Sequence, residues 1–281
     1  MGAGVAQRLA EHKVKVLTTL DGRSAASTAR AREAGMTAVP FERLVEAQLV
    51  LSIVPPGAAV SLAKQMAPLL AAERKARGSS DGGPVFVDCN AVNPETVQEI
   101  GAIIAATGTP FVDAAIIGQP PKPGAPGPHL YVAGAESGRV GTLGDYGLDV
   151  RVLDGPVGAA SALKMCYAGI NKGLAAIGAA MILAASRSGA TAALYQEMSE
   201  SLPNVLNSLR RQVPDMLPKA YRWVGEMHEI AEFADEDPAA RDIFKGFARL
   251  FAQVAKDVDG ESRESATLKD FFDKNPPLNP P

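Results

Sequence analysis

Short β-rich runs alternate with helical segments through the first part of the chain, and this alternation stops abruptly near residue 155. Such alternation is typical of a parallel sheet covered by helices. Beyond it the strand pattern disappears, and 159–188 has the small and apolar composition of one long buried helix. We therefore predict an α/β domain at 1–155, an all-helical domain at 156–274, and a disordered proline-rich tail at 275–281.

Local patterns place the individual elements of both domains. Strands are expected at 13–19, 49–54, 85–88, 110–115, 130–132 and 150–153. Further helices are expected at 2–11, 25–34, 57–77, 94–106, 203–216, 219–233 and 238–257. Loops rich in glycine, serine or proline are expected at 78–83 and 119–128.

Composition excludes several classes of protein. The 281 residues are 47% hydrophobic and 21% charged, as in a soluble globular protein. The net charge is −3 with scattered lysines and arginines, so no nucleic-acid footprint is expected. Cys89 and Cys166 form no zinc motif or disulfide framework, which indicates a reducing, cytoplasmic compartment and no metal site. The most apolar stretch, 173–185, is too short to span a bilayer, so no membrane association is expected.

The first residues, MGAGVAQRL, bear on nucleotide binding. A dinucleotide-binding fold opens with a strand and a Gly-x-Gly-x-x-Gly turn that leads into a helix. Gly2 and Gly4 cannot begin that motif, because Gln7 occupies the position of its last glycine. If Gly2 is instead the third glycine, the first strand and two glycines are absent, and Met1 is expected to be an internal methionine. The coding sequence upstream would test this; the alternative is a pair of small residues at a frayed terminus.

Five later segments carry recognisable motifs: LDGRS at 20–24, SIVPP at 52–56, DCNAVNP at 88–94, DAAIIGQP at 113–120 and GPVGAASALK at 155–164. In this order they resemble motifs of the 3-hydroxyacid and 6-phosphogluconate dehydrogenase superfamily, and the resemblance covers nearly the whole chain. The last resembles Gly-x-x-Gly-x-Gly-x-x-x-Lys, with Ala160 in place of its final glycine. Residues 164–173 and 222–227 resemble a subgroup whose helical C-terminal domain is poorly characterised.

The resemblance implies a Rossmann-like parallel sheet, here lacking its first strand, followed by an all-helical substrate and dimerisation domain. It also implies a catalytic general acid/base at Lys164. An amine can fill that role if burial brings its pKa towards neutrality. Where the 3-hydroxyacid enzymes carry asparagines one turn further on, this chain has Tyr167 and Ala168. Asn171 lies seven residues after Lys164, about 20° away around a helix, and is our candidate for the polar partner. Composition alone would make Lys164 a solvated helix lysine.

The cofactor that the resemblance implies is NADP, with NAD as the alternative. Arg23 and Ser24 would bind a 2′-phosphate, whereas Asp21 would favour a free ribose unless it serves only the Asp-Gly turn. The backbone at Val54 and Pro55 would pass beside the cofactor, unless these prolines only end a strand. The predicted cofactor-binding residues are Gly2, Arg23, Ser24, Val54, Pro55 and Asn90.

The substrate contacts that the resemblance implies lie on two segments. Asn90 replaces a family serine and can still donate and accept hydrogen bonds, while Asn93 before Pro94 is the expected helix N-cap. Ile116 and Ile117 replace valine and serine, which makes the site more apolar; a strand end with a plain glycine turn is the alternative here. The predicted substrate-binding residues are Asn90, Ile117, Gly118, Gln119 and Tyr167.

The expected function is hydride transfer between NADP and a small hydroxyacid-type alcohol or carbonyl, in a cytoplasmic homodimer. An imine reductase of the same fold is one alternative, because the family asparagines are missing. A catalytically silent nucleotide-binding or dimerisation protein is another, because the glycine-rich turn is missing.

Overall fold

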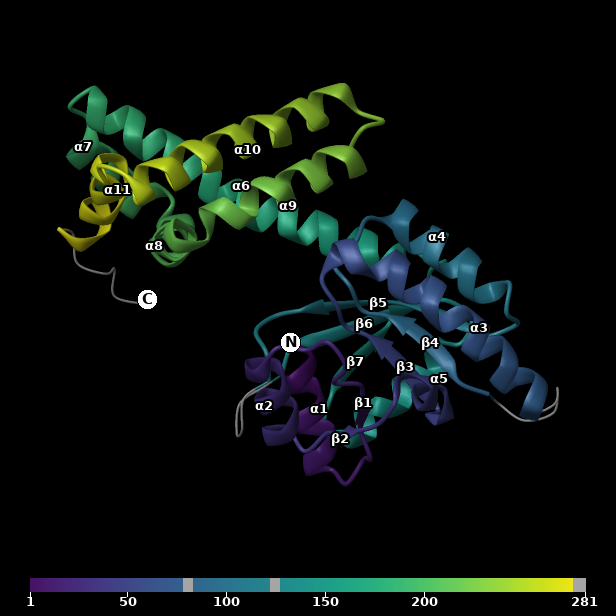
Figure 1. Ribbon diagram of the computed structural model, residues 1–281. Helices are drawn as coiled ribbons and strands as arrows, with labels where there is room; N and C mark the ends of the chain where they lie inside the picture. The colour runs from purple at the N-terminus through teal and green to yellow at the C-terminus, as the bar shows by residue number, and fades with distance from the viewer. Residues whose placement is uncertain (78–82, 122–126, 275–281) are drawn as a thin grey trace. The chain divides into compact units, whose positions relative to one another are not determined.

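A computed structural model describes residues 1–77, 83–121 and 127–274 (Figure 1). The predicted disorder of the tail lies outside these described residues, as do most of the predicted loop at 78–83 and the middle of the loop at 119–128.

The chain divides into two compact units, Met1–Lys164 and Met165–Pro281. The division falls inside the long helix that opens the predicted all-helical domain, whereas the sequence placed the boundary just before that helix.

The first unit contains the strands and most of the shorter helices. Its strands are β1 (Leu17–Thr18), β2 (Thr37–Ala38), β3 (Leu49–Ser52), β4 (Val85–Asp88), β5 (Phe111–Ile117), β6 (His129–Ala133) and β7 (Asp149–Val152). Its helices are α1 (Gly2–Glu11), α2 (Ala25–Glu33), α3 (Ala59–Arg77), α4 (Pro94–Ala105) and α5 (Ser137–Gly141), with 3-10 turns η1 (Phe41–Glu46), η2 (Pro56–Ala58) and η3 (Thr142–Tyr146).

The described strands form two sheets. β1 and β2 pair in parallel by themselves, and a five-stranded sheet has the order β3-β4-β5-β6-β7. In a dinucleotide-binding sheet of order 3-2-1-4, the first strand separates the second from the fourth. Here β1 and β3 correspond to that second and fourth strand, and they do not pair with each other. This agrees with the predicted sheet lacking its first strand. The sequence did not predict one reversal: β6 runs antiparallel to β5, while the other pairs are parallel.

Alternation along the strands gives the five-stranded sheet two apolar faces. Val85 and Val87 of β4 point to the face covered by α1 and α5, whereas Phe86 points to the face covered by α3 and α4 (Figure 1). All three are fully buried. The central strands are therefore covered on both sides, as predicted for an α/β domain.

The second unit is helical. It contains the greater part of α6 (Ala159–Arg187), followed by α7 (Thr191–Ser201), α8 (Pro203–Met216), η4 (Leu217–Lys219), α9 (Ala220–Phe233), α10 (Pro238–Asp259) and α11 (Arg263–Asp273). α7 and α11 were not predicted. α9 and α10 pack along each other (Figure 1), with Trp223 edge-on to Phe251 at a centroid distance of 5.3 Å. The prediction that Trp223 belongs to the core is confirmed.

α6 is the one described helix long and apolar enough to cross a membrane by length and composition. Small residues on it, among them Ala175, Ala176 and Ala179, are fully buried in the core of the helical unit. Gly178 lies among them, and a Cβ there would overlap the Leu209 side chain of α8. This part of α6 is thus a core helix whose small residues permit close packing.

Two glycines within helices provide a matched test of this packing. Gly225 in α9 has open space where a Cβ would be, so Gly225→Ala should stabilise the chain by about 0.5–1 kcal/mol through helix propensity. Gly178→Ala gains the same propensity but must displace Leu209, and should destabilise by about 1–3 kcal/mol. Urea denaturation of both variants measures the difference. Equal stabilisation by both would contradict close packing at Gly178.

Candidate active site

A row of polar side chains crosses the five-stranded sheet at the carboxyl ends of β3 and β4 and in the first half of β5. The strand register places Ser52 beside Asp88 and Asp88 beside Asp113. Their exposures are 2%, 1% and 0%. The residues two positions earlier on the same face are apolar: Val50, Phe86 and Phe111. The apolar core on this face therefore borders a buried polar row.

Asn90 forms hydrogen bonds that connect the ends of β3 and β4. Its Oδ1 accepts a hydrogen bond of 2.7 Å from the Val54 N–H, and its Nδ2 donates to Ser52 Oγ and to Asp88 Oδ2, both at 2.8 Å. Its own backbone N–H donates to Asp88 Oδ1 at 3.0 Å. Both side-chain N–H donors are therefore used inside the protein, and the residue is only 3% exposed. This geometry supports a positioning role; contact with a substrate or cofactor stays a prediction.

Asp88 is a buried carboxyl in this network. Burial raises its pKa, and the neighbouring charge of Asp113 acts in the same direction. Hydrogen bonds from Asn90 and Ser52 oppose the shift. The polar row therefore holds a carboxyl group whose proton affinity depends on its hydrogen-bond partners.

Asp113 caps the N-terminus of α6. Its Oδ2 accepts hydrogen bonds from the backbone N–H groups of Gly158 and Ala160, both at 2.9 Å, and of Ser161 at 3.1 Å. Its Oδ1 accepts a bond of 2.7 Å from the Ser161 hydroxyl. Gly158 has a φ of 106°, a conformation that favours glycine. The carboxylate thus satisfies donors that the first turn of a helix leaves without partners.

Lys164 follows directly on this cap, one turn into α6, and is half-buried. Burial lowers its pKa, while the negative charges of Asp88 and Asp113 partly oppose that shift. A lowered pKa increases the fraction of neutral amine near pH 7, which a proton-transferring lysine requires. The structure therefore places the predicted acid/base beside the buried polar row.

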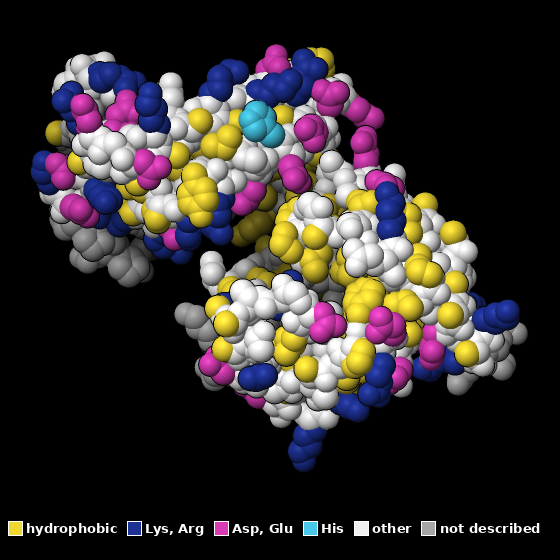
Figure 2. All heavy atoms as spheres, viewed as in Figure 1, with side chains coloured by type: hydrophobic (Ala, Val, Ile, Leu, Met, Phe, Trp, Pro, Cys, Tyr) yellow, Lys and Arg dark blue, Asp and Glu magenta, His cyan; other side chains and the backbone are white. Residues whose placement is uncertain are grey.

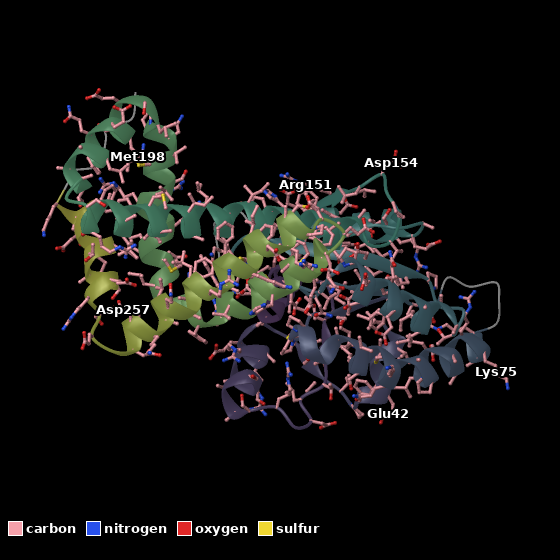
Figure 3. All side chains as sticks on the ribbon, turned by 90° about the horizontal axis from the view of Figure 1, so that it is seen from above. Glu42, Lys75, Arg151, Asp154, Met198 and Asp257 are labelled. Carbon is pink, nitrogen blue, oxygen red and sulfur yellow. The ribbon has the colours of Figure 1, made fainter. Side chains whose placement is uncertain are left out.

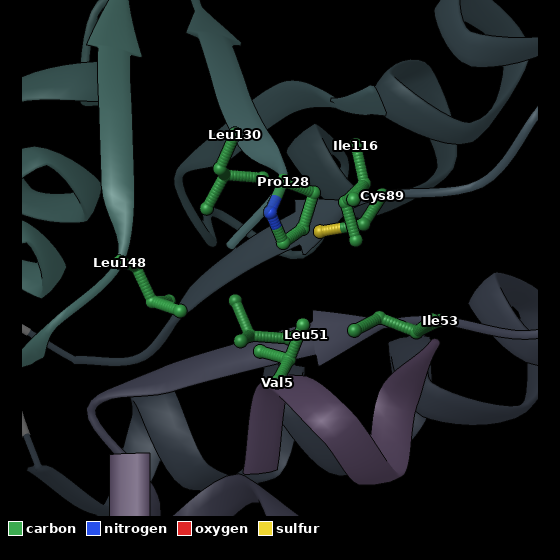
Figure 4. A pocket seen from close by; sticks show the side chains of 8 residues that line it. All are labelled: Val5, Leu51, Ile53, Cys89, Ile116, Pro128, Leu130 and Leu148. Atoms are coloured by element: carbon green, nitrogen blue, oxygen red, sulfur yellow. The ribbon is translucent and has the colours of Figure 1, made fainter. Parts of the chain in front are cut away.

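Cys89 contributes to the opposite face of the sheet. Together with Val5, Leu51, Ile53 and other apolar side chains it lines a small apolar cavity between α1 and the sheet (Figure 4). Burial raises the pKa of its thiol far above the ordinary range. This agrees with the interpretation of Cys89 as a buried apolar residue, because the nucleophilic form of cysteine is the thiolate.

The first turn of α1 is the candidate site for a pyrophosphate. A Cβ at Gly2 would lie 3.8 Å from the Ile53 side chain, so this turn packs against the end of β3. A Cβ at Gly4 would come within 2.9 Å of Pro121 Cδ. The N-cap residue, Met1, makes no side-chain capping bond. A helix N-terminus of this kind attracts anions through its free backbone N–H groups.

The predicted ribose-binding residues follow β1. Arg23 is exposed, and its side chain can reach solvent or a ligand. Ser24 is the N-cap of α2: its Oγ accepts a bond of 3.3 Å from the Ser27 N–H and donates to Ser27 Oγ. Val54 and Pro55 follow β3, where the Val54 N–H is bonded to Asn90. A guanidinium at a strand end and a helix N-terminus fit a phosphorylated dinucleotide chemically.

The predicted substrate segment leaves the sheet at the end of β5. Ile117 is half-buried and pairs with His129, and Gln119 is exposed. Gly118 has a φ of 130°, and a Cβ there would lie 3.1 Å from Pro128. Glycine is therefore required at Gly118 for the backbone to turn away from the sheet.

Two predicted site residues belong to the helical unit. Tyr167 is 54% exposed. Asn171 is half-buried, and its Oδ1 accepts a bond of 3.0 Å from Gln212 Nε2 of α8. The neighbouring Lys172 pairs with Glu226 and lies over the Trp223 ring, at 5.6 Å from its centroid. Asn171 thus has a structural partner, and its role beside Lys164 stays a prediction.

Sequence reasoning did not assign the buried polar row to the site. Ser52, Asp88 and Asp113 lie in the recognised motifs, but they were not predicted to be site residues. The available signal was a single polar or charged residue in each of three otherwise apolar strands, since buried charges require partners.

Two family models match the chain. Residues 1–139 match the NAD binding domain of 6-phosphogluconate dehydrogenase, and residues 185–254 match a domain of unknown function, DUF1932.

Three solved structures are similar over most of the chain. A conserved protein of unknown function, described as similar to 3-hydroxyacid dehydrogenases, is 28% identical with a TM-score of 0.74, over 92% of this chain and 93% of that one. 3-Hydroxyisobutyrate dehydrogenase from Mycobacterium tuberculosis, determined with L-serine, is 20% identical with a TM-score of 0.69, over 95% and 94%. An imine reductase from Myxococcus stipitatus in complex with NADP+ is 15% identical with a TM-score of 0.52, over 97% and 96%. The last two likenesses concern the fold alone.

Proposed function

The chain belongs to the superfamily of nicotinamide-dependent oxidoreductases that contains the 6-phosphogluconate and 3-hydroxyacid dehydrogenases, and from this premise we propose its reaction. It transfers hydride between NADP and a small hydroxyacid-type alcohol or carbonyl, with Lys164 as the general acid/base. The observation that carries this proposal is the half-buried Lys164 amine, whose pKa burial lowers, beside the buried polar row.

Each residue of the site has a distinct task in this proposal. A bound nicotinamide supplies or accepts the hydride. The Lys164 amine takes the proton of the hydroxyl during oxidation and its ammonium returns a proton to the oxygen during reduction. Asn90 holds the end of β3 in place through the Val54 N–H. Gly118 turns the chain at the end of β5, leaving room for a substrate carboxylate near the backbone.

The first experiment is a titration of the purified chain with NADPH and with NADH, followed by thermal unfolding. Saturable binding with a rise in melting temperature is expected for NADPH, because a ligand that binds only the folded state stabilises it. A cooperative melting transition that neither cofactor shifts would contradict the proposal.

Arg23 provides a test of the choice of cofactor. Arg23→Ala removes a guanidinium that we propose pairs with the 2′-phosphate. The dissociation constant for NADPH should rise about 10- to 100-fold, since a charge-assisted pair contributes about 1.5–3 kcal/mol, while that for NADH should change little. Arg32→Ala, an exposed arginine further along α2, is the control. Equal weakening of both cofactors by Arg23→Ala would argue against the 2′-phosphate contact.

An imine reductase is the second candidate function. The supporting observation is the apolar pair Ile116 and Ile117 at the end of β5, of which Ile116 is buried, together with the fold shared with an imine reductase. Screening alcohols, carbonyls, amines and imines with NADPH and NADP+ separates the two activities.

A catalytically silent nucleotide-binding or dimerisation protein is the third candidate. The supporting observation is that the described strands form two separate sheets: β1 pairs only with β2, and β3 is the edge strand of the five-stranded sheet. Failure of the cofactor titration in a folded chain would favour it.

We also propose a homodimer in the cytoplasm, with a small-molecule substrate and without nucleic-acid or membrane partners. Ile170, Ile177 and Met181 recur along one face of α6 and are 75%, 53% and 55% exposed, which an apolar interface would cover. Charges of both signs are interspersed on the visible face in Figure 2. Both cysteines are free thiols. Sedimentation equilibrium would measure the oligomeric state.

A further inference from the structure

One buried carboxylate connects the strand that leads into the substrate segment with the helix that carries Lys164. Asp113 lies on β5, and its four hydrogen bonds all go to the start of α6, 45 to 48 residues further along the chain. The residue is 0% exposed. An ionised carboxylate only accepts hydrogen bonds, so four converging donors match its chemistry.

The capped turn is the one that determines where Lys164 points. Ala160 and Ser161 precede Lys164 by four and three residues, so all three lie on one face of α6. Side chains on a helix lean towards its N-terminus. The Lys164 side chain therefore leans over the turn that Asp113 holds, and a rotation or shift of that turn would move the amine.

The charged groups facing Lys164 come from β4 and β5. Burial favours the neutral amine, whereas the negative charges of Asp88 and Asp113 favour the ammonium. Of these two, Asp113 also holds the helix in place, so it affects both the position and the charge of Lys164.

We propose that Asp113 is a positioning residue for the acid/base: it fixes the first turn of α6 and supplies a negative charge that keeps the Lys164 amine able to hold a proton. This inference rests on the proposed function of Lys164 and adds a determinant of its proton transfer that lies outside the family's lysine motif.

The test measures Lys164 itself, without substrate or cofactor. The full chain is labelled with limiting acetic anhydride over a range of pH, and acetylation of Lys164 is quantified by mass spectrometry of its peptide. Only the neutral amine reacts. Asp113→Asn keeps an oxygen that can accept from the helix N–H groups but removes the charge, so acetylation at pH 8 should rise about threefold or more. Its pH profile should shift towards lower pH.

Two variants serve as controls. Ser161→Ala removes one hydrogen bond but keeps the charge, and the profile of Lys164 should stay close to that of the unmodified chain. Asp257→Asn alters a cap on another helix, where Asp257 accepts from Glu264 and Ser265 at the start of α11; Asp257 lies in the helical unit (Figure 3). It should affect stability without changing Lys164 acetylation.

An unchanged Lys164 profile in folded Asp113→Asn would overturn the proposal. If that variant does not fold, Asp113→Ser, which keeps one acceptor and also removes the charge, is measured in the same way. Unfolding of both would assign the carboxylate to stability alone and overturn the proposal as well. A shifted profile combined with full activity of Lys164→Ala would refute the proposed function and leave the coupling between Asp113 and Lys164 intact.

Discussion

Replacing Lys164 by alanine should lower kcat by about two to four orders of magnitude, the range that positioned acid/base groups contribute. The dissociation constant for NADPH should change less than about threefold, because the cofactor contacts that we propose lie at the start of α1 and after β1, β3 and β4 rather than on α6. The effect on kcat should be large because Lys164 is a half-buried amine beside the polar row, and burial lowers its pKa.

Steady-state kinetics with an active substrate and a parallel cofactor titration separate these two effects. Lys172→Ala is the matched control, because Lys172 lies eight residues further along α6 and is paired with Glu226. It should keep kcat within about threefold. Full activity of Lys164→Ala would remove Lys164 from the mechanism, whereas loss of NADPH binding in that variant would indicate a damaged site rather than a missing proton carrier.

The strongest local patterns in the sequence predicted elements closely. β4 matches its predicted range, and α6 ends one residue before the predicted end. The predicted cap of α4 is confirmed, with Asn93 Oδ1 accepting a bond of 2.8 Å from the Thr96 N–H. These elements were predictable because a buried central strand, a long run of small apolar residues and an Asn-Pro start are each specified by neighbouring residues.

The antiparallel direction of β6 was not predicted from the sequence. Parallel neighbours need a crossover of a dozen or more residues, usually with a helix. The connection at 118–128 is instead short and rich in proline and glycine. Loop length and composition therefore contained the signal for an antiparallel pair, but strand patterns alone do not give direction.

The site was predictable only in part for a related reason. Lys164 came from a motif contained within ten residues. The Asp113 cap joins residues 45 or more positions apart, and the register of Ser52, Asp88 and Asp113 depends on how three strands align. No local spacing encodes such contacts, so they require the fold.

Asn90 carries the second large prediction. Asn90→Leu keeps the branched shape of the side chain but removes the acceptor for the Val54 N–H and the donors to Ser52 and Asp88. Buried groups left without partners should cost about 2–4 kcal/mol in the free energy of unfolding. Urea denaturation measures this loss. Asn93→Ala, three residues away, removes a single capping bond and should cost only about 1 kcal/mol.

The same pair of variants decides between two roles for Asn90. A positioning role predicts that Asn90→Leu loses both stability and NADPH affinity, because the released end of β3 is the segment we place beside the cofactor. A direct substrate contact predicts a different result: Asn90→Leu loses kcat/KM but is as stable as Asn93→Ala. The second result would contradict the positioning role, and it would require the Asn90 amide to exchange its bonds to Ser52 and Asp88 for a bond to the substrate. Because those bonds are both 2.8 Å long and buried, we expect the first result.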